Sequence, residues 1–209
     1  MPVLLTCFLS FTLSFSPTDI DTIPSNSLLY NGREYAKQYT VDMGSPFFPT
    51  ENSTGDILYQ GNWYRGVIFF YDCEDEVLVI TLPEGQRMQL VMGKVDAFTL
   101  DNHSFLKLEM KGQPGEFYEL LFQGQRQLLV KWRKYLIKNM QEQSVYVTSR
   151  KIFVSDGSSL VNIEKLQDFI DLFPSQKKLL RQVYREKDLS FRKDPVKASN
   201  ELMKSLQLK

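Results

Sequence analysis

Residues 64–82 read YRGVIFFYDCEDEVLVITL, in which two apolar runs flank the acidic segment DCEDE. The runs, 64–71 and 77–82, are rich in β-branched and aromatic residues and have the length of strands. The segment between them, 72–76, is polar and short enough for a turn. This stretch predicts two buried antiparallel strands joined by a tight connection.

The same pattern of short apolar runs and turn residues extends on both sides of this hairpin. Residues 31–32 (Asn-Gly) predict a hairpin turn, and residues 44–49 (GSPFFP), with two prolines, predict an extended crossing or an edge segment. Further strands are expected at 56–59, 88–92, 97–100, 105–110, 116–122, 127–135, 144–148 and 151–154. Short strands joined by turns at this spacing are typical of a sandwich or barrel. The fold class is therefore mainly β (α+β), an antiparallel β-meander forming a sandwich or barrel-like sheet.

Towards the C-terminus the apolar spacing changes from that of strands to that of helices. Apolar residues in 163–173 share one helical face, and Pro174 ends that helix. The spacing recurs twice, and Asp194-Pro195 has the residues of a helix start. Short amphipathic helices bury little alone, so we expect two or three of them in residues 163–209, packed on the meander.

The chain length fits one domain. No linker rich in Gly, Ser or Pro separates the meander from the helices. We therefore expect a single domain over residues 28–209, composed of the meander at 28–162 and the helical tail at 163–209.

The N-terminal segment points to export. Residues 2–15 (PVLLTCFLSFTLSF) are uncharged and shorter than the ~20 residues of a membrane-spanning helix, which is the pattern of a signal-peptide core. Because no Lys or Arg precedes them, either the true start lies upstream or this segment is a buried first strand. We expect a signal peptide at 1–16, an unstructured mature N-terminus at 17–27, and a periplasmic or envelope-associated location.

Charge is balanced overall but unevenly distributed. Residues 124–209 carry 18 basic and 9 acidic side chains, and residues 1–123 carry the remaining 7 and 16 of the 25 of each kind. Such asymmetry can indicate an anionic partner, but a solvated helical surface balanced by acidic turns is the better explanation, because the basic residues are spread out and form no dense block.

Three short motifs carry a resemblance to a known group. They are NGREY at 31–35, GSPFF at 44–48 and GEFYELLFQG at 115–124, within a long meander that ends in a helical tail. In this order they resemble uncharacterised exported β-meander proteins of Gram-negative envelope bacteria. The resemblance implies export and a β-meander fold, and it brings no catalytic or binding residues.

Single residues that could carry chemistry each have a simpler explanation. His103, the only histidine, lies in the polar turn DNHS, where such residues serve backbone geometry. Cys73 is surrounded by acidic residues, which raise a thiol pKa and disfavour a nucleophile. Glu116 and Glu119 are three apart on a strand and are expected to point to opposite faces. The sequence therefore predicts no catalytic residue, no metal site and no cofactor.

One segment has the composition of a binding platform. Residues 131–135 interleave bases with aromatics, as glycan and nucleic-acid surfaces do, and an edge strand protected by charges has the same composition. On a strand, Trp132 and Lys134 would share one face and the other three the opposite face. The candidate partner or anion surface consists of Lys131, Trp132, Arg133, Lys134 and Tyr135.

These observations favour a non-catalytic envelope protein that acts as an interaction or assembly module with a protein partner. No nucleic-acid partner is expected, while membrane contact and oligomeric state stay open. The alternative is a small-ligand carrier, for a lipid or a glycan, which uses a β-barrel-like cavity. A third reading is an enzyme that uses carboxylates. A filled interior with an exposed apolar patch would favour the partner, and an open apolar cavity would favour the carrier.

Overall fold

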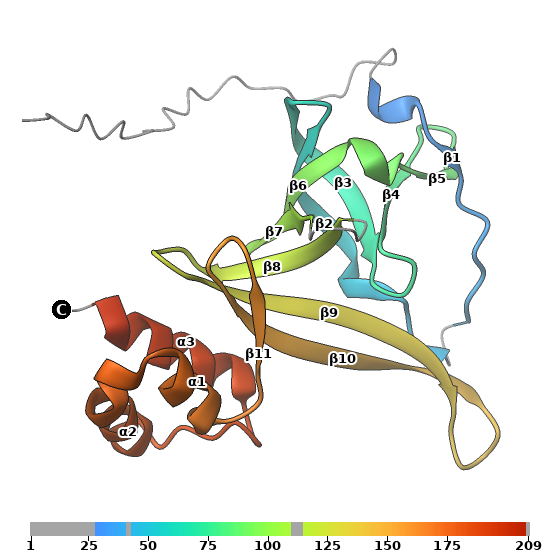
Figure 1. The fold of residues 1–209 in the computed structure, drawn as a ribbon. Coiled ribbons are helices and arrows are strands. Elements are labelled where there is room, and N and C mark those ends of the chain that lie inside the picture. The colour runs from blue at the N-terminus through green and yellow to red at the C-terminus, as the bar shows by residue number, and fades with distance from the viewer. Residues whose placement is uncertain (1–27, 41–42, 110–114, 208–209) are drawn as a thin grey trace, which may run out of the picture.

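The structure is a computed structural model that describes residues 28–40, 43–109 and 115–207 (Figure 1). Its strands are β1 (Arg33–Glu34), β2 (Phe47–Tyr59), β3 (Asn62–Asp72), β4 (Val77–Thr81), β5 (Arg87–Gln89), β6 (Val95–Leu100), β7 (His103–Leu108), β8 (Glu116–Phe122), β9 (Gln127–Lys138), β10 (Ser144–Ser155) and β11 (Leu160–Ile163). The helices are α1 (Leu166–Leu172), α2 (Lys177–Glu186) and α3 (Pro195–Gln207). The predicted signal peptide and mature N-terminus lie outside the described residues.

The strands form one open antiparallel sheet in the order β1-β5-β4-β3-β2-β6-β7-β8-β9-β10-β11. From β6 to β11, strands that are consecutive in sequence are also neighbours in the sheet. This confirms the prediction of a mainly antiparallel β-meander followed by short C-terminal helices. None of the described helices is long and apolar enough to cross a membrane.

The segment at 44–49 runs into the start of β2, where Phe47 and Phe48 pair with β3 on one side only, because the pairing of β2 with β6 begins at Gly55. The prediction of an extended crossing or an edge segment is therefore confirmed, although β2 as a whole lies between β3 and β6.

Two other local predictions were wrong. The two strands expected at 144–148 and 151–154 are one strand, because β10 pairs with β9 along its whole length. The Asn-Gly pair makes no hairpin; a Cβ on Gly32 would lie 2.3 Å from the Gln89 carbonyl oxygen, so glycine permits β1 to approach β5.

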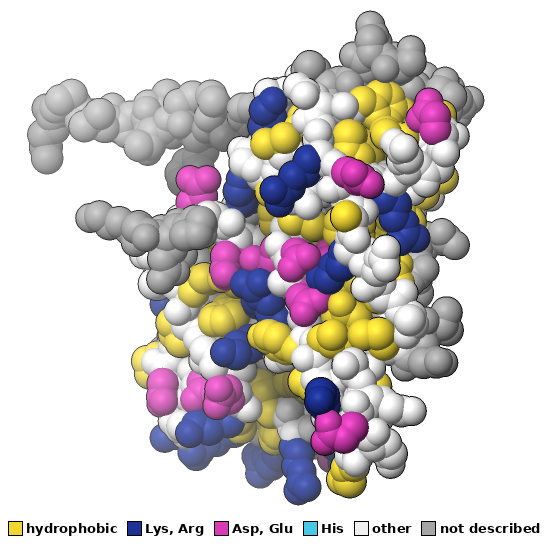
Figure 2. Space-filling view, turned by 90° about the vertical axis from the view of Figure 1, so that its right-hand side faces the viewer, with side chains coloured by type: hydrophobic (Ala, Val, Ile, Leu, Met, Phe, Trp, Pro, Cys, Tyr) yellow, Lys and Arg dark blue, Asp and Glu magenta, His cyan; other side chains and the backbone are white. Residues whose placement is uncertain are grey.

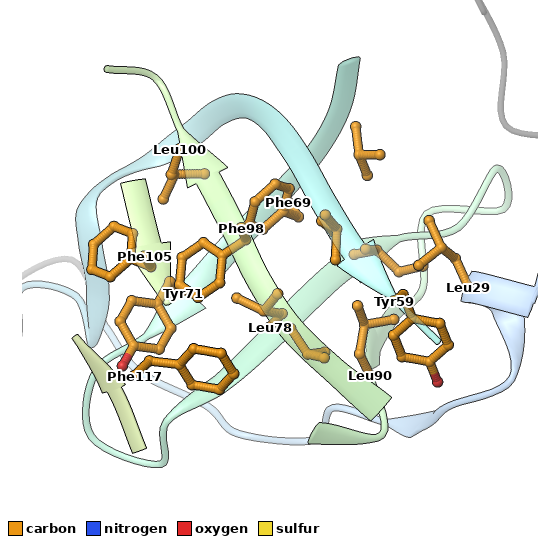
Figure 3. Close-up of a cluster of buried hydrophobic side chains, with 14 of the residues drawn as sticks. Leu29, Tyr59, Phe69, Tyr71, Leu78, Leu90, Phe98, Leu100, Phe105 and Phe117 are labelled. Atoms are coloured by element: carbon orange, nitrogen blue, oxygen red, sulfur yellow. The ribbon is translucent and has the colours of Figure 1, made fainter. Parts of the chain in front are cut away.

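The first half of the sheet curls around an aromatic core. Its largest buried rings include Phe69, Tyr71, Phe98, Phe105 and Phe117, each at most 3% exposed (Figure 3). These side chains come from β3, β6, β7 and β8 and point toward one another inside the curl. Burial of such rings supplies both hydrophobic stabilisation and specific ring–ring contacts.

The helices form a second core against the other end of the sheet (Figure 1). Phe169, Leu180 and Leu202 from the three helices are fully buried and pack with Val130 of β9 and Ile152 of β10. The expectation that the helical tail packs on the meander is therefore confirmed.

A seam joins β9 to the connection between β3 and β4. The Lys134 backbone N–H donates to the Cys73 carbonyl oxygen at 3.3 Å, and the Cys73 N–H donates to the Pro46 carbonyl oxygen at 3.0 Å. The fully buried Asp72 carboxylate organises the same connection, since it accepts hydrogen bonds from Tyr35 Oη and Lys37 Nζ. The curl of the sheet thus brings the middle of β9 beside residues that are far away in sequence.

Candidate functional site

The five residues of the predicted binding surface lie in the middle of β9, the strand between β8 and β10. β10 pairs with these residues on one side, whereas the pairing of β9 with β8 ends at Val130. This part of β9 therefore has a strand on one side only, as the alternative of an edge strand protected by charges predicted. The five do not form one exposed patch: Lys131 is 6% exposed and Tyr135 is 50% exposed, while the three residues between them are half-buried. Lys134 Nζ donates to the Ser45 carbonyl oxygen at 2.9 Å, so its charge faces the protein.

Lys131 and Arg133 belong to an internal ion-pair network. The Lys131 ammonium pairs with Glu76 and lies 3.4 Å from Glu116 Oε2, and Arg133 Nη2 lies 2.8 Å from Glu116 Oε1 and 3.1 Å from Glu76 Oε2. Burial lowers the pKa of Lys131 despite its two acidic partners. Burial alone would raise the pKa of Glu116, but Lys131, Tyr118 and Arg133 hold it below its usual value. Both cations are therefore committed to internal carboxylates.

Beyond this network the β9–β10 hairpin continues as a two-stranded ribbon that projects from the rest of the molecule (Figure 1). We call residues 135–147 the ribbon end. On one of its faces Tyr135 is opposite Val147 and Ile137 is opposite Val145. Its exposed apolar residues are Tyr135 (50%), Leu136 (41%), Ile137 (47%), Met140 (100%) and Val147 (42%).

The outer edge of β10 has room for another strand. β11 pairs with β10 only from Ile152 to Ser155. In the part of the chain that the structure describes, no strand covers the outer edge of β10 from Ser144 to Lys151. Figure 2 views the molecule from the right-hand side of Figure 1. It shows hydrophobic side chains below a mixed group of acidic and basic side chains at the centre of the view. The ribbon end thus combines apolar side chains with unpaired backbone groups.

Cys73 is sealed in the seam and carries no exposed sulfur. Its residue is fully buried, and burial raises the pKa of the thiol to about 12; the nearby Lys134 opposes this rise and Asp72 adds to it. The acidic surroundings predicted from the sequence are present, but burial is the larger cause.

This burial makes the thiol unreactive in the folded protein. In a Cys7→Ser variant at pH 8, we expect Cys73 to react with a maleimide at least about a hundredfold more slowly than in denaturant, because thiolate is the nucleophile. A matched control is Met140→Cys in a chain lacking both native cysteines, since position 140 is fully exposed. Equal labelling rates at the two positions in folded protein would contradict a sealed seam.

His103 and Glu119 form a cluster that the sequence reading did not anticipate. His103 is the first residue of β7, and its Nδ1 lies 2.5 Å from Glu119 Oε1. Trp132 Nε1 donates to Glu119 Oε2 at 2.6 Å. The prediction that Glu116 and Glu119 point to opposite faces fits these contacts, because Glu116 pairs with Arg133 instead. Only the strand register, which no local motif reveals, brings the three side chains together.

No family model, curated protein or solved structure matches the chain. We therefore infer its function from the chemistry and exposure of the described residues.

Proposed function

We propose that the protein is an exported, non-catalytic envelope protein that acts as an interaction or assembly module, and that it binds a protein partner through the ribbon end. The observation that carries this proposal is the set of exposed apolar side chains on a ribbon whose β10 edge is open. Contiguous exposed apolar surface and open strand edges are both features that proteins normally cover.

The open edge favours one kind of occupant, an extended segment of the partner that adds as a strand beside β10. The eight residues Ser144–Lys151 match the length of such a segment, and their backbone groups could form a ladder with it. Apolar side chains at alternate positions of the segment would then extend the face formed by Tyr135, Ile137 and Val147. Main-chain bonds would provide affinity and the apolar face specificity.

The interior of the curl favours this function over a carrier. Phe98 stacks on Phe105 with ring centroids 4.5 Å apart and contacts Phe117 at 5.3 Å, so large rings occupy the space that a ligand would need. A cleft of about 620 Å³ lies beside the helices, and Gln125, Arg126 and Asp156 are among its polar lining residues.

The buried acids support a non-catalytic role. In the described residues Asp72 and Glu119 are the buried carboxylates, and they have no hydrogen-bond partner in common. A carboxylate enzyme with buried acids needs them to converge in one cleft, and Asp72 does not line the cleft that Glu119 lines. Export is supported by the leader-like composition of residues 2–15 and by the resemblance to exported meander proteins.

The proposal is tested by crosslinked pull-down of the tagged, full-length protein from the native cell envelope. We expect a stoichiometric partner that an Ile137→Asp, Val147→Asp variant loses by at least about tenfold, since central apolar contacts dominate interfaces. The matched control is Ile68→Asp, because Ile68 is 60% exposed but lies on β3. A peptide with the sequence of the partner's binding segment should bind the purified protein. The Ile137→Asp, Val147→Asp variant should weaken this binding, and Ile68→Asp should not.

Two outcomes would overturn the proposal. One is recovery of the protein alone in a soluble fraction, which would redirect attention to a bound small molecule and its extraction for mass spectrometry. The other is a partner that the ribbon variant and the Ile68→Asp control retain or lose equally.

A further inference from the structure

A second feature lies away from the ribbon end, between α3 and the sheet. The Glu119 side chain is 5% exposed and accepts hydrogen bonds from both His103 and Trp132. Phe48 packs edge-on against His103 at 5.0 Å and lies 4.8 Å from Trp132, which fixes both rings. In the neutral tautomer whose Nδ1 donates to the Glu119 carboxylate, Nε2 is an acceptor for another partner. His103 is 38% exposed, so a ligand can reach it.

This cluster forms one wall of a cleft of about 430 Å³. Helix α3 provides much of the opposite wall, and Arg150 of β10 also lines the cleft. Its lining combines apolar side chains, namely Leu121, Val196 and the Trp132 ring, with charged and polar ones. The cleft is built from separate strands and a helix.

The acids that line the cleft already have partners within the protein. Glu119 binds His103 and Trp132, as described. Asp194 Oδ1 accepts the backbone N–H of Lys197 at 3.0 Å, and the Glu201 carboxylate pairs with Lys187. None of the three acids therefore needs an external cation.

Other polar groups of the cleft have no partner. In the described part of the chain, the side chains of Arg150 and Lys197 make no hydrogen bond or ion pair, and both are exposed. The side-chain oxygen of Asn200 is buried without a hydrogen-bond partner. A buried acceptor without a partner costs free energy unless a ligand or water supplies a donor. Because the Asn200 oxygen has almost no solvent-exposed surface, it does not face the open cleft. The groups that a ligand in the cleft can reach are thus two cations and one acceptor, His103 Nε2 in neutral imidazole.

We propose that this cleft binds a small hydroxylated anion of the sugar acid or sugar phosphate class. Arg150 and Lys197 hold the anionic group, and a hydroxyl of the ligand donates to His103 Nε2. Glu119 is a positioning residue that fixes the His103 ring, so that Nε2 can exchange a hydrogen bond with the ligand. A planar guanidinium and an ammonium suit carboxylate and phosphate alike, so the shared chemistry defines the class.

The sequence itself provides a specific reporter for this site. His103 is the only histidine, and Trp132 is one of two tryptophans, so their side-chain NMR signals can be assigned by single substitutions. Four probes are titrated into the full-length protein: glucose 6-phosphate, glucuronate, glucose and inorganic phosphate. The first two should shift the His103 and Trp132 signals saturably. Glucose lacks the anion and phosphate lacks the hydroxylated body, so both should bind at least about tenfold more weakly.

Variants connect the signal to the cleft. Arg150→Ala with Lys197→Ala should weaken glucose 6-phosphate binding at least about tenfold. His103→Ala, followed through the Trp132 signal, should reduce the advantage of glucose 6-phosphate over inorganic phosphate. Arg181→Ala, an exposed cation on α2, is the matched control and should bind as the unmodified protein does. Equal thermal unfolding midpoints would show that the surface variants remain folded.

Three results would overturn the proposal: no probe shifts His103, glucose binds as well as glucose 6-phosphate, or the Arg150→Ala, Lys197→Ala variant binds unchanged. If glucuronate and glucose 6-phosphate bind with different affinities, the difference would identify which anion the site prefers within the proposed class. The Ile137→Asp, Val147→Asp variant should retain ligand binding, so this site and the partner surface succeed or fail separately.

Discussion

Replacing Phe98 with alanine is expected to lower the free energy of unfolding by about 3–5 kcal/mol, as large-to-small changes at packed aromatic positions do. Phe98 of β6 is fully buried at the centre of the curl (Figure 3). Its ring centroid lies 4.5 Å from Phe105, 5.1 Å from Tyr71, 5.3 Å from Phe117 and 5.9 Å from Phe69. Truncation would leave a cavity bordered by four rigid rings, which cannot collapse into it easily.

Denaturant unfolding followed by circular dichroism measures this loss. Tyr135→Ala is the matched control, because the same kind of truncation at a 50% exposed position should change stability by less than about 0.5 kcal/mol. If Phe98→Ala does not fold, Phe98→Leu should fold and show a smaller loss. Similar losses for Phe98→Leu and Tyr135→Ala would show that the rings of the curl do not depend on one another.

The strands were largely predictable because their signals are local. The runs at 64–71 and 77–82 correspond to β3 and β4, and the acidic segment between them is the turn. A strand needs only an apolar run of the right length with turn residues at its ends. Lengths were less predictable, since β10 continues through polar residues that pairing with β9 keeps extended.

Sheet order depended on contacts that no local pattern encodes. β2 lies between β3 and β6, and β1 pairs with β5 at the far edge. The proline-containing start of β2 pairs on one side only, as an edge segment does, and it carries Phe47 and Phe48, which are almost completely buried. The pairing with β3 shifts register between Phe48 and Ser53, the interval that contains Pro49.

The candidate site also depends on contacts that no local sequence pattern encodes. Strand alternation correctly separates Trp132 from Lys131 and Arg133, since Trp132 binds Glu119 while the two cations bind Glu76 and Glu116. Glu76, however, is 55 residues away from Lys131 in the sequence. Composition alone therefore identified a charged aromatic segment but could not show that its first lysine is internal. Composition also could not show that the apolar residues after this segment are exposed, because their exposure depends on the projection of the ribbon end from the rest of the molecule.

Replacing Asp72 with alanine is expected to cost about 3–5 kcal/mol of unfolding free energy, because it removes one member of a buried, hydrogen-bonded charge cluster. The Asp72 side chain is fully buried. Its Oδ2 accepts from Tyr35 Oη at 2.7 Å and Lys37 Nζ at 3.0 Å, and its Oδ1 accepts the backbone N–H groups of Glu74 at 2.8 Å and Asp75 at 3.1 Å. Without the carboxylate, the tyrosine hydroxyl and the turn would lose their acceptor together.

The chain provides a close control, since Asp75 also binds Lys37, at 2.9 Å, but is 54% exposed. Exposed ion pairs contribute little, so Asp75→Ala should cost less than about 1 kcal/mol. Asp72→Asn should fall between the two, because the amide oxygen can still accept from the turn while the charge that holds Lys37 is gone. Equal losses for Asp72→Ala and Asp75→Ala would show that the segment from Tyr35 to Lys37 is held by surface charge alone. A much larger loss for Asp72→Ala would establish the buried carboxylate as the group that joins this segment to the β3–β4 connection and, through Cys73, to β9.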